Sequence, residues 1–151
     1  MFSRLDDQAR RALVYAQGEA MARGDTEIRT GHLLYVLANT EDSQAREVLS
    51  GLGVDALAIG SHLAGGGAGT LGSTPLSANL RSVLLTCDSV AAGRSGHAAS
   101  VDFLGAMVWL PECGAISILG SLGVSADALG RALEPYGWTR PQTASLEMKP
   151  V

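Results

Sequence analysis

The chain has few of the residues on which catalytic and metal sites are built. Its two cysteines, Cys87 and Cys113, are too far apart for a metal-ligand motif and too few for a disulfide framework. We interpret both as small core residues. The three histidines are widely separated, and no serine, cysteine and histidine group indicates a nucleophile. No Walker motif occurs in the sequence. These shortages predict a protein that is not an enzyme and that needs no cofactor and no metal.

Basic charge and long apolar runs are also scarce. The net charge is −4, whereas a general nucleic-acid-binding protein needs a basic face that displaces counterions. No stretch reaches the roughly 18 apolar residues of a membrane span. The sequence becomes acidic at Asp6 and Asp7 and lacks the apolar core of a signal peptide. We therefore expect a cytoplasmic location, with neither nucleic acid nor a membrane as partner.

An internal duplication is the strongest pattern that is present. The stretch from Leu49 to Val54 returns as the stretch from Leu119 to Val124, at an offset of 70 residues. Upstream, leucines match at an offset of 71, which pairs Leu33 with Leu104. The sequence therefore predicts two related halves that differ by one residue.

Apolar spacing within each half is helical, and no window alternates convincingly with a period of two. In the first helix, for example, the buried stripe is expected to contain Ala9, Ala12, Leu13, Ala16 and Ala20. The expected helices cover residues 7–23, 31–39, 43–51, 55–64, 77–93, 102–110, 112–120 and 125–134. This predicts an all-α fold of eight short helices, arranged as two pseudo-twofold related four-helix repeats.

The expected organisation is one compact domain. A first repeat covers residues 1–64, a glycine-rich flexible linker 65–75 and a second repeat 76–136. A tail, 137–151, is expected to be mobile apart from a docking of Trp138.

Three stretches carry a resemblance to a known family. They are the opening Met1-Phe2-Ser3-Arg4-Leu5, the helix from Ala9 to Ala20, and Ile28-Arg29-Thr30-Gly31-His32-Leu33-Leu34. With the Leu-Gly-Val turns that close both halves, the sequence resembles the Clp N-terminal domain (Clp repeat) of ClpA- and ClpC-type AAA+ unfoldases. The resemblance covers Met1 to about Tyr136. Because no ATPase module follows in this sequence, the resemblance implies a stand-alone N-domain without the ATPase modules of the unfoldases. A domain excised from a longer protein is the alternative.

The resemblance implies two kinds of site. In ClpC-type members each repeat can bind phosphoarginine, through a hydroxyl before the first helix and a glutamate in a Thr-Glu-His motif. By position the first repeat offers Asp6 and Gly31, which suit neither group, so its site is expected to be inactive. The second offers Ser77 and Asp102, which keep a hydroxyl and a carboxylate. The simpler interpretation, which we favour, is that both are plain helix caps.

The second implied site is an apolar groove between the repeats, which binds adaptors, substrate segments and cyclic-peptide antibiotics. Phe2, Gln17, Leu76 and Arg81 fall at groove positions. Phe2 is as well explained as a core staple for the first helix, and Arg81 as a solvated helix residue.

These implications favour a non-enzymatic protein- or peptide-binding module that acts as an adaptor or accessory factor in Clp-dependent proteolysis. Its partners would be a Clp unfoldase, its adaptors or its substrates. One alternative is a decoy that sequesters cyclic-peptide antibiotics aimed at such N-domains. A small helical hydrolase is the remaining alternative, and the lack of a titratable cluster disfavours it.

Overall fold

The structure, a computed structural model, describes residues 5–25, 27–40, 43–63, 76–93, 96–110 and 113–138. These residues form α1 (Asp7–Ala22), α2 (Thr30–Asn39), α3 (Gln44–Gly51), α4 (Ala56–Gly60), α5 (Ala78–Gly93), α6 (Ser100–Val108), α7 (Gly114–Ser121), α8 (Ala126–Leu133) and the 3-10 helix η1 (Glu134–Tyr136). Two isolated bridges are the extended pairings found among them. The all-α prediction with eight helices is confirmed. The linker predicted at 65–75 and the tail beyond Trp138 lie outside the described residues.

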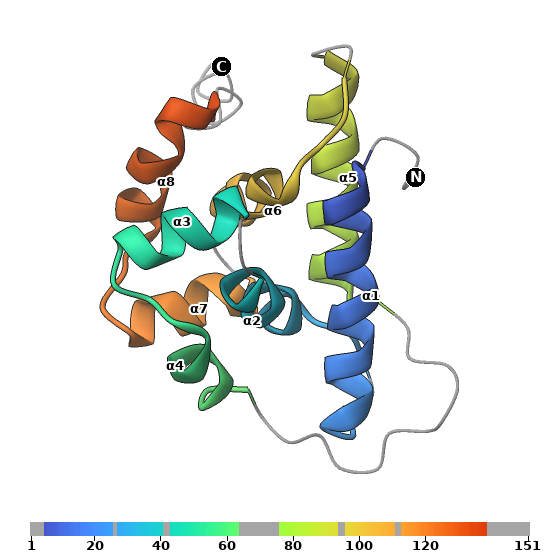
Figure 1. The fold of residues 1–151 in the computed structure, drawn as a ribbon, viewed down its shortest axis with the longest axis vertical. Coiled ribbons are helices and arrows are strands. Elements are labelled where there is room, and N and C mark those ends of the chain that lie inside the picture. Colours follow the sequence, from blue (N-terminus) through green and yellow to red (C-terminus); the bar gives the residue numbers. More distant parts are fainter. Residues whose placement is uncertain are drawn as a thin grey trace, which may run out of the picture.

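The helices form two similar sets around a shared centre (Figure 1). α1 packs on α2 and α5 packs on α6, while α4 and α8 cover the opposite sides of α2 and α6. In addition, α2 packs on α7 and α6 packs on α3, so each central helix contacts the opposite repeat. The repeats therefore share one hydrophobic core.

At each of the two bridges, a backbone hydrogen bond joins one repeat to the other. The amide of Asp6, which precedes α1, donates to the carbonyl of Ala98, which precedes α6 (2.9 Å). Equivalently, the amide of Ser77 before α5 donates to the carbonyl of Ile28 before α2 (2.9 Å). Each first helix is thus anchored at its start to the other repeat.

A further hydrogen bond between the repeats forms at the start of α2. Thr30 is the first residue of this helix, and its hydroxyl accepts a bond from the amide of Ala115 in α7 (3.0 Å). The Thr30 side chain thus satisfies a free amide at the start of a helix in the other repeat.

The duplicated stretch ends α3 and α7 in the same way. Gly53 and Gly123 have φ of 81° and 88°, a left-handed conformation that a glycine adopts without strain. The next amides, of Val54 and Val124, bond back to the carbonyls of Leu49 and Leu119 (2.9 and 2.8 Å). These are Schellman motifs, and both valines are buried. α3 thus ends at Gly51, as expected, and Gly53 is the residue that reverses the chain after it.

The one-residue difference between the halves lies earlier than the sequence predicted. α1 and α5 both have 16 residues, but 23–29 separate α1 from α2 whereas 94–99 separate α5 from α6. From the second helix onward the offset is consequently 70. Ser100 is the counterpart of Thr30, and Asp102 is the counterpart of His32. The predicted equivalence of Gly31 and Asp102 is wrong for this reason, and α6 begins at Ser100 rather than at Asp102.

Trp138 is buried and closes the second repeat. Its indole stacks edge to face with Trp109 at 5.1 Å between ring centroids. It lies so close to Gly105 that a Cβ there would overlap the indole. In the first repeat the counterpart of Gly105 is Tyr35, whose ring lies instead against Gly60, 3.1 Å from the point where a Cβ would stand. The docking of Trp138 expected from the sequence is confirmed.

We predict that Gly105→Ala lowers the free energy of unfolding by about 1–3 kcal/mol, because the added methyl group must displace a rigid buried ring. The matched control is Gly120→Ala, a helical glycine with open space around its Cα. This control should be neutral or stabilising by up to about 1 kcal/mol, because alanine is the better helix former. Urea unfolding measures both; equal effects would contradict the packing described for Trp138.

Candidate functional site

His32 is buried at the third position of α2 and closes the start of that helix. Its Nδ1 accepts a bond from the amide of Arg29 (2.8 Å), and its Nε2 lies 3.3 Å from a carboxylate oxygen of Asp25. Since Nδ1 accepts, the ring proton stands on Nε2, the nitrogen that faces Asp25. Burial lowers the pKa of His32 below its ordinary 6.5, although the Asp25 carboxylate acts in the opposite direction. The neutral ring is therefore the form that fits this site.

Asp102 occupies the equivalent position in α6 and does the same work with other partners. One carboxylate oxygen accepts from the amide of Ala99 (2.7 Å) and the other from the indole nitrogen of Trp138 (2.6 Å). Only 1% of Asp102 is exposed. Its carboxylate therefore joins the start of α6 to the end of the described chain.

This placement bears on the predicted phosphoarginine sites. Ser77 is buried and its hydroxyl accepts from the amide of Leu80 (3.2 Å), so it caps α5, as Asp6 caps α1 through the amide of Ala9. Asp102 presents its carboxylate to the interior and not to a ligand. The structure thus gives Ser77 and Asp102 the capping roles that the sequence left open.

The corrected offset moves the family's glutamate position to Gly31 and Val101, and both residues are buried. A Cβ on Gly31 would stand 2.9 Å from Leu63 and 3.0 Å from Ile118. Neither repeat offers an exposed carboxylate at this position. A phosphoarginine site at Ser77 and Asp102 is not supported by this geometry.

The predicted groove residues lie on or just before the first helices of the two repeats. Gln17 is half-buried on α1, and Leu76 is half-buried in the bridge that precedes α5. Arg81 is exposed in the first turn of α5. Phe2 lies outside the described residues. The groove as a common site of all four residues stays a prediction.

Exposed apolar residues on these same helices were not singled out from the sequence. Among the described residues, five large apolar side chains are exposed: Val14, Tyr15 and Met21 on α1, Leu85 on α5, and Leu57 on α4. Val14 and Leu85 are counterparts at the offset of 71, and 62% and 51% of them are exposed. The sequence does contain a signal for these two residues, because both are apolar and lie outside the buried apolar stripe of their helix.

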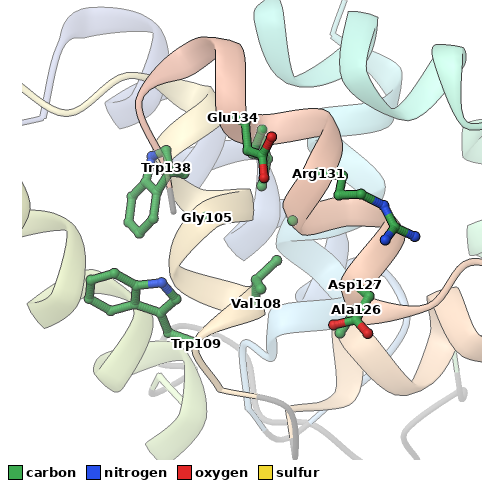
Figure 2. A pocket seen from close by; sticks show the side chains of 10 residues that line it. Gly105, Val108, Trp109, Ala126, Asp127, Arg131, Glu134 and Trp138 are labelled. Carbon is green, nitrogen blue, oxygen red and sulfur yellow. The ribbon is translucent and has the colours of Figure 1, made fainter. Parts of the chain in front are cut away.

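Two cavities accompany these surfaces. An open hollow of about 660 Å³ lies between α1 and α2, lined by Val14, Tyr15, Gly18 and Tyr35 among others. A smaller one of about 300 Å³ lies between α6 and α8, beside both tryptophans (Figure 2). Gln17, Leu76 and Arg81 line neither.

Within the described ranges, no cluster of three histidine, cysteine or acidic residues could hold a metal ion. No single helix described here has the length and apolar character of a membrane span. The pair Gly114–Ser121 and Ala126–Tyr136 would pass together on those criteria, but it bends by 104° at the break.

The model of the Clp repeat (R) N-terminal domain matches residues 4–104 of this chain. Among curated protein sequences none is significantly similar. Among solved structures, the chain is similar to the N-terminal domain of the chaperone ClpD from Arabidopsis thaliana, with a TM-score of 0.70 and 21% identity over 90% of this chain and 96% of that one.

Two further structures are comparably similar. The Hsp104 N-terminal domain from Candida albicans has a TM-score of 0.73 and 16% identity, over 90% of this chain and 93% of that one. The N-domain of ClpV from Vibrio cholerae has a TM-score of 0.70 and 19% identity, over 91% and 90%. These likenesses support the same fold.

Protonation of His32 should destabilise the fold. A proton on Nδ1 would face the amide of Arg29 and remove the hydrogen bond at the start of α2. The positive charges of Arg23 and Arg29 also disfavour a charged His32. The carboxylates of Asp25 and Glu19 favour it. Since the folded-state pKa is lowered, the stabilising contribution is complete above the unfolded pKa of about 6.5 and is lost as the pH falls through the folded pKa.

We therefore predict that the melting temperature falls as the pH is lowered from about 8 to about 5, and that His32→Gln flattens this dependence. Glutamine can still accept from the amide of Arg29 but does not titrate. Calorimetric melts across this pH range test it. An unchanged slope in the variant would assign the acid sensitivity to other groups.

Proposed function

Because this chain belongs to the Clp repeat (R) N-terminal domain family, whose domains are protein-interaction modules of Clp and ClpV ATPases, we propose that it binds polypeptides through the surface of α1 and α5. The observation that carries the proposal is the distribution of exposed apolar residues. Of the five large ones among the described residues, four lie on these two helices. Scattered exposed apolar residues are ordinary, but a concentration on one pair of related helices is typical of an interaction surface.

The proposed ligand is an apolar peptide segment. Val14 and Leu85 supply equivalent apolar contacts on the two repeats, and the predicted groove residue Arg81 adds an exposed cation on α5. Arginine and aromatic side chains dominate interface energies, which suits a segment with apolar side chains and accessible carbonyls. The helices are held in place by the shared core, so little ordering free energy is lost on binding.

The biological role we propose is that of an adaptor or accessory factor in Clp-dependent proteolysis in the cytoplasm, which presents substrates or competes for them. The chain would act by binding and not by catalysis. The decoy role, sequestration of an apolar cyclic peptide, uses the same surface and differs only in its ligand. Titration with a Clp unfoldase and with a cyclic apolar peptide separates the two roles.

Leu85→Ala should weaken the binding of an apolar peptide about tenfold, or by roughly 1–2 kcal/mol, because it removes an exposed contact from the centre of α5. Phe2→Ala and Arg81→Ala should produce losses of the same size if the predicted groove is the site. The melting temperature should change little in Leu85→Ala and Arg81→Ala, since both residues are exposed. A sharp fall in Phe2→Ala with unchanged affinity would instead identify Phe2 as a core staple.

The matched control is Leu57→Ala, which removes the same apolar group from α4, where 84% of Leu57 is exposed. Titration calorimetry compares all four variants with the wild-type chain. Equal losses from Leu57→Ala and Leu85→Ala would show that the peptide adheres to any exposed leucine, and would refute a specific surface on α1 and α5.

A further inference from the structure

The cavity between α6 and α8 brings together the chain's two tryptophans (Figure 2). Trp109 and Trp138 form one side of it, and Val108 lies between them and the opposite side, which carries Asp127 and Arg131. The indole nitrogen of Trp138 bonds to the buried Asp102 at 2.6 Å, so this ring is fixed in orientation. A pocket of about 300 Å³ with a rigid aromatic wall is large enough for one side chain of a ligand.

The residues that form the pocket in the second repeat are different in the first. Where α6 has Gly105, α2 has Tyr35, and the tyrosine ring covers Gly60, the counterpart of Gly130 in the pocket lining. The charges also have no counterpart, because Leu57 and Ser61 stand at the positions of Asp127 and Arg131. The shared fold therefore does not require the pocket.

The charges at the pocket favour a cation. Asp127, Arg131 and Glu134 are its charged lining residues, two carboxylates against one guanidinium. Figure 2 shows Glu134 between Trp138 and Arg131, which lies three residues earlier at the end of α8. Glu134 is exposed, and no partner for its carboxylate is found in the described part of the chain. Indole faces also attract cations, and guanidinium groups stack on them.

We propose that this pocket binds an arginine side chain of a partner polypeptide. The aliphatic stem would lie against Val108 and the indoles, and the guanidinium would pair with Glu134. The proposal rests on the proposed function only in taking a polypeptide as ligand. It adds a subsite with a chemistry different from that of the apolar surface on α1 and α5.

The two tryptophans give a direct test, because the chain has no others. A capped Gly-Arg-Gly peptide is titrated into the full chain while tryptophan fluorescence and the two indole N–H resonances are followed. Saturable changes in both resonances are expected, and the neutral Gly-Gln-Gly peptide should bind at least about tenfold more weakly. Equal binding of the two peptides would overturn the assignment of a cation site.

Two variants locate the site. Glu134→Gln should weaken arginine binding about tenfold, since it removes the exposed carboxylate. Gly130→Leu should abolish it by filling the pocket; a Cβ at Gly130 meets only Val108 within 4 Å, at 3.7 Å, so the helix accepts the change. The matched control is Gly120→Leu on α7, which should bind as the wild type does. Wild-type affinity in Glu134→Gln, or equal losses in the two leucine variants, would refute the site.

The test must also separate a partner's arginine from Arg140 of this chain, which stands two residues beyond Trp138 in the sequence and outside the described residues. If the peptide binds only when Arg140→Ala is introduced, the occupant is the chain's own arginine and the proposal of a partner's side chain is overturned. The apolar peptide is titrated into the same samples. Loss of arginine binding alone refutes the pocket and leaves the proposed function standing, whereas failure of the apolar peptide alone refutes only the surface on α1 and α5.

Discussion

Two backbone hydrogen bonds, from Asp6 to Ala98 and from Ser77 to Ile28, tie the start of each first helix to the opposite repeat. The remaining architecture depends on this exchange. It places α1 and α5 against the central helices, and α2 and α6 then pack on α7 and α3 across the repeats. Because every central helix contacts both halves, the buried residues of the two repeats form one continuous core. The outward faces of α1 and α5 remain as the surface that the core does not use.

The two repeats solve one local problem with different chemistry. The start of each central helix needs an acceptor for a free amide. His32 supplies it in α2, supported by Asp25, and Asp102 supplies it in α6, supported by Trp138. The first solution is sensitive to protonation, and the second recruits a residue from the end of the described chain. The difference between His32 and Asp102 at one buried position therefore has two consequences. The start of α6 carries no histidine, and Trp138 is held beside the pocket of the second repeat.

The fold followed from the sequence because apolar spacing and the repeated Leu-Gly-Val turns are local signals. The helix cap at Ser77, which the sequence offered as an alternative to a ligand site, is a local signal of the same kind and is observed. The site was harder to predict. One residue missing before α6 moved Asp102 from an expected ligand position into the interior, and alignment of leucines could not reveal this, since Leu33 and Leu34 are both buried and either can match Leu104. The pocket beside Trp109 arises from contact between Gly105 and Trp138, 33 residues apart in sequence, which no periodicity encodes.

The exchanged bridges also have an evolutionary reading. Two separate copies of one such repeat would make the same contacts as a twofold symmetric dimer, in which residue i of one copy meets residue j of the other and the reverse. The folding of that dimer would depend on protein concentration. Joining the copies in one chain removes this dependence. It also allows each half to change independently. The first repeat has Tyr35 where the second has Gly105, and two identical chains could not differ in this way.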